Sequence, residues 1–221
     1  MIKTETMLFV TGTGTEVGKT IVSAILVKAM GAYYWKPVQA GIEPATDTET
    51  VQMLSGLDKS FFLPEAYQLK TPASPHYAAA VEGIEIEVEK IRLPETGGLL
   101  VVEGAGGMMV PLKTGFLFRD LMKQLNLPVV LVAAYYLGAI NHTILSLEAL
   151  KFSDIPIAAV VLNGNWENQA ETFVRNHYPE IHFLNVPFNE NPDAAFVEHQ
   201  AKLLTETEGF KKLKHEVDRK R

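Results

Sequence analysis

One short segment, Gly12-Thr13-Gly14-Thr15-Glu16-Val17-Gly18-Lys19-Thr20, strongly limits how this chain can fold. It follows an apolar run at residues 7–10 and leads into an apolar helical pattern at residues 20–30. A strand that ends in a glycine-rich turn and then opens a helix builds a phosphate cradle, because backbone N–H groups and a helix N-terminus converge on negative charge. The sequence therefore predicts a nucleotide-phosphate site, with Lys19 at the terminal phosphates and the Thr20 hydroxyl on Mg²⁺.

The segment departs at one position from the pattern G-x-x-x-x-G-K-[ST]. Thr13 stands where the first glycine is expected, and Gly12 and Gly14 flank it. A glycine-rich turn with a solvated lysine is the alternative interpretation. The order of strand, turn, Gly-Lys-Thr and apolar helix favours the phosphate site.

Short apolar runs alternate with helical patterns along the chain. The predicted strands are residues 7–10, 33–36, 99–102, 129–133, 158–162 and 181–186. The predicted helices are residues 20–30, 47–54, 86–93, 116–125, 140–152 and 167–176. This alternation predicts an α/β fold, a doubly wound and mainly parallel sheet with helices on both faces. Ligands of such a sheet bind at the carboxyl ends of the strands.

The length of 221 residues, of which 47% are hydrophobic, suits one well-filled core. We therefore expect a single P-loop NTPase-like domain over residues 1–221, with a charged helical tail from about residue 205. Residues 61–82 contain three prolines and are expected to form a largely irregular excursion that contributes to a substrate pocket.

Several polar residues stand at or near the predicted strand ends. Glu103 follows residues 99–102 and could bind Mg²⁺ or serve as a turn acid. Asp47 could be a second metal ligand or could cap the helix that it begins. Lys36, fixed by Pro37, could neutralise phosphate charge in the cleft or be an ordinary surface lysine. Asn163 follows the strand at residues 158–162.

Composition excludes several classes of function. The net charge of -6 argues against nucleic-acid and membrane-surface partners. The absence of cysteine excludes thiolate catalysis and thiolate metal sites, and no G-x-S-x-G segment supports serine hydrolysis. The first residues lack an apolar signal core, and the longest apolar stretch, residues 128–140, is shorter than the roughly 20 residues of a spanning helix. We expect a cytoplasmic protein.

Five motifs, taken in their order, resemble the dethiobiotin synthetase family, the ATP-dependent carboxylases of biotin biosynthesis. They are Thr11 to Thr20, Trp35-Lys36-Pro37-Val38, Ser74-Pro75-His76, Val102-Glu103-Gly104-Ala105-Gly106-Gly107 and Leu137-Gly138-Ala139-Ile140-Asn141-His142. The likeness extends through at least residue 193.

The resemblance implies a set of site residues. Lys36 and Lys19 would be catalytic, Thr20, Asp47 and Glu103 would surround Mg²⁺, and the substrate would contact Lys36, Ala40, Pro75 and Gly138. The nucleotide would contact Thr15, Glu16, Val17, Gly18, Lys19, Thr20, Ile21, Asp47, Glu103, Gly104, Ala105, Gly106, Asn163, Gly164, Val186, Pro187 and Phe188.

The resemblance also implies a cyclo-ligase reaction. One amine of 7,8-diaminopelargonate would take up CO₂ to form a carbamate, whose oxygen attacks the γ-phosphorus of ATP to give a carbamic–phosphoric anhydride and ADP. The second amine would then close the ring of dethiobiotin and expel phosphate. The family is a homodimer, so residues 137–142 would contact the diamino acid bound by the partner subunit.

Three departures from the family pattern are visible, of which one is the charged tail beyond about residue 205, which has no counterpart in the family. Members usually carry Ser or Thr at the position of Ala40, and an Asp often follows the position of Asn163, where this chain has Gly164. Two rival functions remain open. A partitioning-type P-loop ATPase typically has a second loop lysine where this chain has Gly14, and a guanine-nucleotide switch acting on a protein partner would need an Asn-Lys-x-Asp motif that the segment at 163–166 lacks.

Overall fold

A computed structural model describes residues 7–218 of the chain, with side chains described as far as residue 213. The ends of the predicted domain, residues 1–6 and 219–221, lie outside the described residues, and so does the extreme end of the charged tail.

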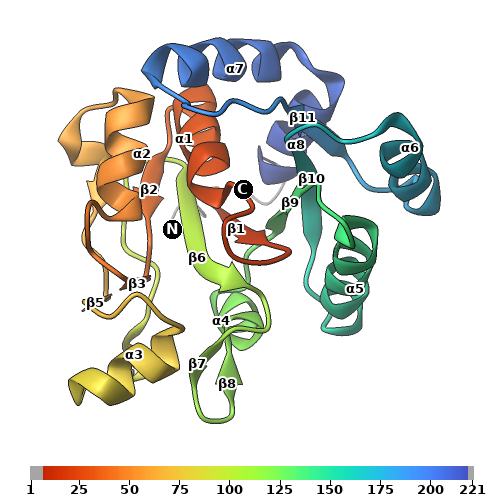
Figure 1. Cartoon of the computed structure of the whole chain (residues 1–221). Coiled ribbons are helices and arrows are strands. Elements are labelled where there is room, and N and C mark those ends of the chain that lie inside the picture. Colours follow the sequence, from red (N-terminus) through yellow and green to blue (C-terminus); the bar gives the residue numbers. More distant parts are fainter. Residues whose placement is uncertain (1–6, 219–221) are drawn as a thin grey trace.

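Seven parallel strands form the central sheet, in the order β11-β10-β9-β1-β6-β2-β4 (Figure 1). Their bounds are β1 (Met7–Gly12), β2 (Tyr33–Trp35), β4 (Phe62–Leu63), β6 (Leu100–Gly107), β9 (Val129–Ala134), β10 (Ile157–Asn163) and β11 (Phe183–Val186). The chain first builds the sheet outward from β1 to β4, returns through β6, and then crosses β1 to build the other half. This reversal beside β1 creates a switch point, the place where open parallel sheets bind ligands. The predicted doubly wound α/β fold is confirmed.

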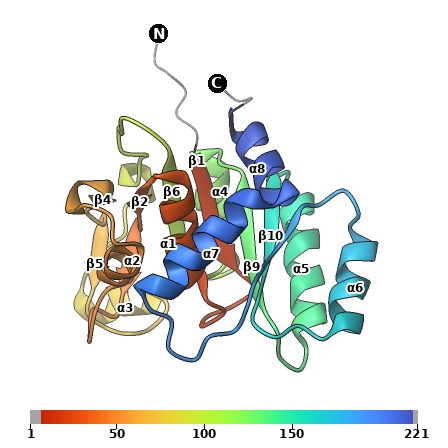
Figure 2. The same cartoon turned by 90° about the horizontal axis from the view of Figure 1, so that it is seen from above.

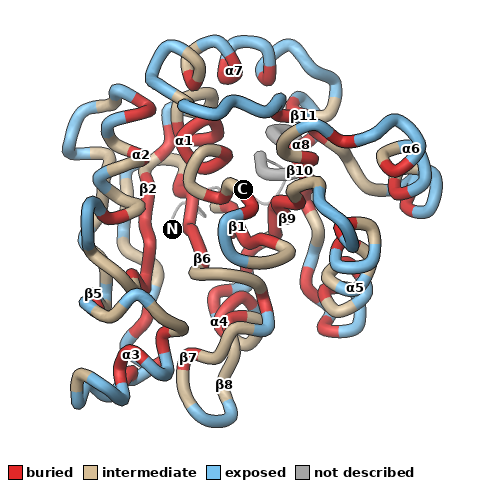
Figure 3. Tube along the Cα trace, viewed as in Figure 1, coloured by how far each residue is buried: buried red, intermediate tan, exposed pale blue. Residues whose placement is uncertain are grey.

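Helices cover both faces of the sheet because successive strand side chains point to opposite faces. Leu8 and Val10 of β1 pack under α1 (Lys19–Met30), α2 (Asp47–Ser55), α7 (Ala194–Glu206) and α8 (Glu208–Asp218). Phe9 packs on the other side with α3 (Pro75–Glu82), α4 (Phe118–Leu125), α5 (Ala139–Phe152) and α6 (Asn168–His177). Figure 2 shows α7 crossing over α1, and the tube of Figure 3 is buried along the central strands and along α1.

Two predicted segments differ from the structure. The helix predicted at residues 86–93 is wrong: only a 3-10 turn, Val88–Lys90, is present there. Apolar and acidic residues alternate at residues 84–89, so Ile86 and Val88 are buried while Glu85 and Glu87 are exposed, which is the period of an extended chain.

Residues 61–82 are more regular than predicted. They contain β4, β5 (Tyr67–Leu69) and α3, and β5 pairs in parallel with β3 (Val38–Ala40). Pro75, counted above as a sign of irregular chain, lies in the first turn of α3, where its missing N–H has no helical partner to lose. A small hairpin of β7 (Pro111–Lys113) and β8 (Phe116–Leu117) precedes α4, so that helix begins two residues later than predicted.

Among the described helices, none is both long enough and apolar enough to cross a membrane.

Candidate active site

The loop between β1 and α1 is shaped by two glycines. A Cβ on Gly12 would lie 2.5 Å from Val17 Cγ2 and 2.9 Å from the Gly14 carbonyl oxygen, so no side chain fits there. Gly18 has φ of 92° and precedes the first turn of α1, a left-handed conformation that favours glycine. Because Gly12 supplies the close approach at the start of the loop, Thr13 in place of the usual first glycine leaves the loop geometry intact.

Lys19, the first residue of α1, curls back over this loop. Its Nζ donates to the Gly14 carbonyl oxygen at 3.1 Å, and the residue is 7% exposed. Burial lowers the pKa of Lys19, and the negative charge of Glu103 offsets that effect only in part. A cation held at the rim of a phosphate loop is suited to binding a polyphosphate.

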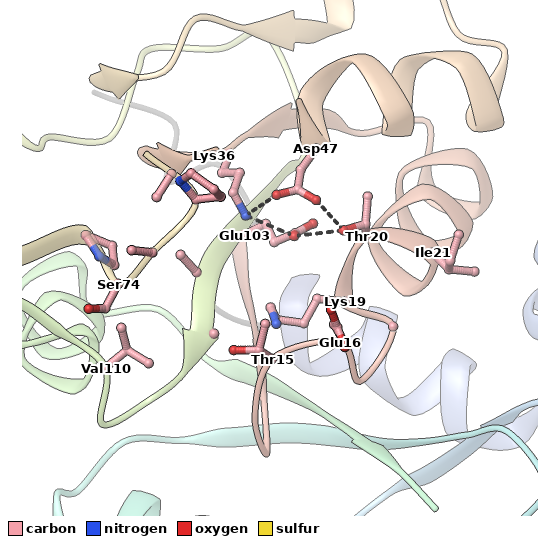
Figure 4. Close-up of a pocket in the computed structure, with 17 residues that line it drawn as sticks. Thr15, Glu16, Lys19, Thr20, Ile21, Lys36, Asp47, Ser74, Glu103 and Val110 are labelled. Atoms are coloured by element: carbon pink, nitrogen blue, oxygen red, sulfur yellow. Dashed lines mark hydrogen bonds and ion pairs between the residues drawn. The ribbon is translucent and has the colours of Figure 1, made fainter. Parts of the chain in front are cut away.

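Two carboxylates and one hydroxyl meet beside the loop (Figure 4). The Thr20 hydroxyl lies 2.6 Å from Asp47 Oδ1 and 3.4 Å from Glu103 Oε1. Asp47 begins α2, but the helix is capped by Thr46, whose hydroxyl accepts from the Glu49 N–H in a capping box. The capping role considered for Asp47 is therefore filled by its neighbour, and its carboxylate points to the cluster instead.

Lys36 follows β2 and lies between the two acids. Its Nζ is 2.8 Å from Asp47 Oδ2 and 3.2 Å from Glu103 Oε1, and it donates to the Gly104 carbonyl oxygen at 3.3 Å. At 2% exposure it is not the surface lysine of the alternative interpretation.

Lys36 and Asp47 stabilise each other's charged forms. Burial alone would lower the pKa of Lys36, but Glu103 and Asp47 outweigh burial and raise it. Burial alone would raise the pKa of Asp47, but Lys36 and the Thr20 hydroxyl lower it. At neutral pH the site therefore holds a charged Lys36 beside a charged Asp47.

Sequence reasoning did not predict two of the contacts to this cluster. The Tyr34 hydroxyl donates to Glu103 Oε2 at 3.0 Å, and Gln39 accepts from the Asp47 N–H at 3.3 Å while donating to the Gly41 carbonyl oxygen at 2.7 Å. Burial raises the pKa of Tyr34 well above its usual value, and the Glu103 charge adds to this, so the hydroxyl stays protonated. Strand alternation was the available signal for Tyr34, because residues 34 and 36 face the same side.

A cavity of about 710 Å³ opens onto the cluster, and many predicted site residues line it. Its predicted lining residues are Thr15, Glu16, Gly18, Lys19, Thr20, Ile21, Lys36, Ala40, Asp47, Pro75, Glu103, Ala105 and Gly106, and the remaining ones are Pro72, Ala73, Ser74 and Val110. Segments distant in sequence thus meet at one edge of the sheet.

Other predicted residues do not line this cavity. Val17 is buried beneath the loop and its carbonyl oxygen accepts from Asn163 Nδ2 at 3.0 Å, while Gly104 meets the cluster through its carbonyl oxygen. Gly164 donates to the Val186 carbonyl oxygen at 2.8 Å, which places the ends of β10 and β11 side by side. Pro187 and the exposed Phe188 follow β11, and Gly138 precedes α5.

The residues present fit a hard cation. Among the described residues, no group of three or more His, Cys, Asp or Glu side chains is arranged to hold a metal. Mg²⁺ needs less than that, since it binds through one or two carboxylates together with phosphate oxygens and several waters. Thr20, Asp47 and Glu103 supply an all-oxygen set of this kind.

The sheet, the glycine-rich loop and the Gly-Lys-Thr helix start define a P-loop nucleotide-binding protein of the α/β class. A family model described as an AAA domain, AAA_26, matches residues 6–195. The fold is similar to that of a ParA family ATPase from Chlorobium tepidum TLS, with a TM-score of 0.53, 97% of this chain and 96% of that chain covered, and 12% identity. At that identity the likeness shows the fold alone.

Two curated relatives carry the comparison further. The chain is 50% identical over 167 residues to the ATP-dependent dethiobiotin synthetase BioD of Rhodopseudomonas palustris (strain HaA2), covering 76% of this chain and 78% of the relative. It is 48% identical over 167 residues to that of Brucella melitensis biotype 2 (strain ATCC 23457), covering 76% and 79%. The chain belongs to the ATP-dependent dethiobiotin synthetase family, as its motifs predicted, and not to either rival class.

Proposed function

We propose that the chain is an ATP-dependent cyclo-ligase of biotin biosynthesis, which converts 7,8-diaminopelargonate, CO₂ and ATP into dethiobiotin, ADP and phosphate. Family membership supports the overall reaction. The observation that carries the assignment to this site is that Lys19, Thr20, Lys36, Asp47 and Glu103, from four separate segments, meet around one cavity.

The phosphate loop and its lysine would bind the triphosphate. Backbone N–H groups of residues 15–18 and the N-terminus of α1 supply the cradle, and Lys19 reaches the terminal phosphates. Thr20, Asp47 and Glu103 would hold Mg²⁺, which on binding neutralises charge on the β- and γ-phosphates.

Lys36 would act in the transfer of the γ-phosphoryl group from ATP to the carbamate. The carbamate formed from one substrate amine and CO₂ attacks the γ-phosphorus, so negative charge builds between the carbamate oxygens and the transferring phosphoryl group. The Lys36 ammonium, held at this point by Asp47 and Glu103, is placed to neutralise that charge. The second amine then attacks the carbamic carbon and releases phosphate, a step that needs positioning more than further acid or base.

The diamine would enter at the end of the cavity formed by Ala40 and residues 72–75. Gln39 is occupied with Gly41 and Asp47, so it does not replace the hydroxyl that relatives have at the position of Ala40. Ser74, which lines the same wall, is the hydroxyl available there.

The nucleotide base would lie beyond this cavity, against Asn163, Gly164, Val186, Pro187 and Phe188, at the ends of β10 and β11. The active form would be a cytoplasmic homodimer in which residues 137–142 reach the substrate of the partner subunit. The fully exposed Leu137, next to Gly138 at the start of α5, supports a contact there.

ATP turnover tests the proposal directly. Purified protein should release phosphate from ATP when 7,8-diaminopelargonate, bicarbonate and Mg²⁺ are all present, with dethiobiotin appearing in equal amount by mass spectrometry. Omission of the diamine is the control, and it should nearly abolish phosphate release. Phosphate release that does not depend on the diamine would contradict the proposed reaction.

A further inference from the structure

Tyr34 places a phenol hydroxyl inside an apolar layer beneath the active site. The residue is fully buried in β2, and it packs in the same cluster as Val10 of β1 and Val101 of β6. Its neighbour in the parallel register is Val101, two residues before Glu103. A buried tyrosine hydroxyl needs a polar partner, and the partner here is Glu103 Oε2 at 3.0 Å.

The two oxygens of Glu103 consequently have different surroundings. Oε2 accepts from Tyr34 on the sheet side, whereas Oε1 lies 3.2 Å from Lys36 Nζ and 3.4 Å from the Thr20 hydroxyl on the cavity side. Glu103 is only 1% exposed, so bulk water has little access to Oε2, where the Tyr34 hydroxyl is the donor. With Lys36 and Thr20 at Oε1, the Tyr34 hydroxyl completes the contacts that orient the carboxylate plane.

Tyr34 itself does not line the cavity. It can influence a ligand only through Glu103, in the way that outer partners orient the ligating carboxylates of metal sites and raise metal affinity.

We propose that Tyr34 is a positioning residue of the cation site, whose hydroxyl holds Glu103 so that Oε1 faces the metal and Thr20. This inference rests on the proposed role of Glu103 in the metal site. It adds a determinant of cation affinity from a strand residue that touches neither the nucleotide nor the diamine.

A purely structural role for Tyr34 makes a different prediction. If the residue only filled the core, removal of its hydroxyl would change the free energy of unfolding and leave cation affinity unaltered. The readout must therefore be cation binding itself.

Mn²⁺ is a suitable probe, because it takes oxygen ligands as Mg²⁺ does and its free form is measured by electron paramagnetic resonance. Mn²⁺ is titrated into the full-length protein with saturating ADP, for wild type, Tyr34→Phe and Tyr33→Phe. Tyr33 is the matched control: it lies in the same strand but stacks on Phe61, with ring centroids 5.1 Å apart.

Tyr34→Phe should raise the Mn²⁺ dissociation constant about 10-fold, the lower end of the range for loss of such outer partners. Tyr33→Phe should leave it unchanged. In steady-state assays, the Mg²⁺ concentration giving half-maximal turnover should rise by about the same factor in Tyr34→Phe. Saturating Mg²⁺ should restore turnover, and KM for the diamine should stay at the wild-type value.

Unchanged Mn²⁺ affinity in a folded Tyr34→Phe protein would overturn the inference while leaving the proposed function intact. Failure of the wild type to bind Mn²⁺ with ADP would instead overturn the metal site and the inference together. Should Tyr34→Phe fail to fold, replacement of Tyr34 by 4-aminophenylalanine keeps a weaker donor in the same place. That protein should show an intermediate loss of Mn²⁺ affinity, and wild-type affinity would count against the inference.

Discussion

The Lys36 ammonium is the counter-ion of Asp47 and Glu103 before any ligand arrives. It lies 2.8 and 3.2 Å from their oxygens, with almost no exposure to water. Lys36 is therefore expected to stabilise the fold as well as to serve the proposed catalysis, and the two contributions are separable by experiment.

For catalysis, Lys36→Met should lower turnover about 10²-fold or more, because it removes a donor aimed at developing charge. Phosphate release at saturating ATP, Mg²⁺ and diamine is the measurement. Near-normal turnover would remove Lys36 from the chemistry.

For stability, Lys36→Met should lower the free energy of unfolding by about 3 kcal/mol without Mg²⁺, since it leaves two close carboxylates without their cation. Added Mg²⁺ should recover part of this loss, as measured by urea unfolding. Lys28→Met is the control, because Lys28 pairs with Glu198 at the partly exposed surface. Its effect should stay below about 1 kcal/mol. Equal losses in the two variants would contradict the account of the buried pair.

The phosphate loop shows how an element is specified by a few positions. Gly12→Ala forces a Cβ to 2.5 Å from Val17 Cγ2 and 2.9 Å from a backbone oxygen, whereas a Cβ on Gly14 would meet its nearest atom only at 4.0 Å. Overpacking of this kind costs about 1–3 kcal/mol.

Gly12→Ala should therefore destabilise the protein by that amount and weaken ADP binding, while Gly14→Ala should leave both within error. Urea unfolding and ADP titration calorimetry measure the two effects. Similar behaviour of the two variants would show that the steric reading of Gly12 is wrong.

Among the helices and strands, the sequence predicted those that show a hydrophobic period or a recognisable motif. The core strands and the helix after the loop follow from apolar runs and from Gly-Lys-Thr. The helix predicted at residues 86–93 is absent, although the alternation of Ile and Val with Glu at residues 84–89 indicated extended chain. The short strands β4 and β5 contain too few residues to show a hydrophobic period. They are extended because β4 pairs with β2 and β5 pairs with β3.

The candidate site was predictable only in part, because contacts between distant segments leave little local pattern in the sequence. Lys36 directly follows β2, Lys19 follows the loop after β1, and Glu103 lies within β6, which continues to Gly107 instead of ending before Glu103 as predicted. The parallel order β1-β6-β2 places these three positions beside one another. Strand alternation places Tyr34 on the same side as Lys36 but does not identify Glu103 as its partner, and no local pattern predicts the contact between Gln39 and Asp47.

For the whole molecule, the proposed homodimer is the property open to test. Leu137 is fully exposed, and Leu145 lies two helical turns further along α5, also exposed. We expect sedimentation to show a dimer that Leu137→Glu shifts toward monomer. Phe152→Glu, at the far end of the same helix and equally accessible, should not do so. A monomeric wild type, or dissociation by both variants, would contradict the proposed interface.

The hydrogen bond from Asn163 to the Val17 carbonyl oxygen joins chain positions that lie on opposite sides of the switch point. This hydrogen bond connects the end of β10 to the phosphate loop. The packing there is tight, because a Cβ on Gly18 would lie 2.1 Å from Asn163 Nδ2. In the proposed binding mode, with the base at β10 and the γ-phosphate at Lys19, this link would set the distance between the two ends of the nucleotide site before any ligand binds. A nucleoside diphosphate would then fill the site without presenting a phosphoryl group to Lys36.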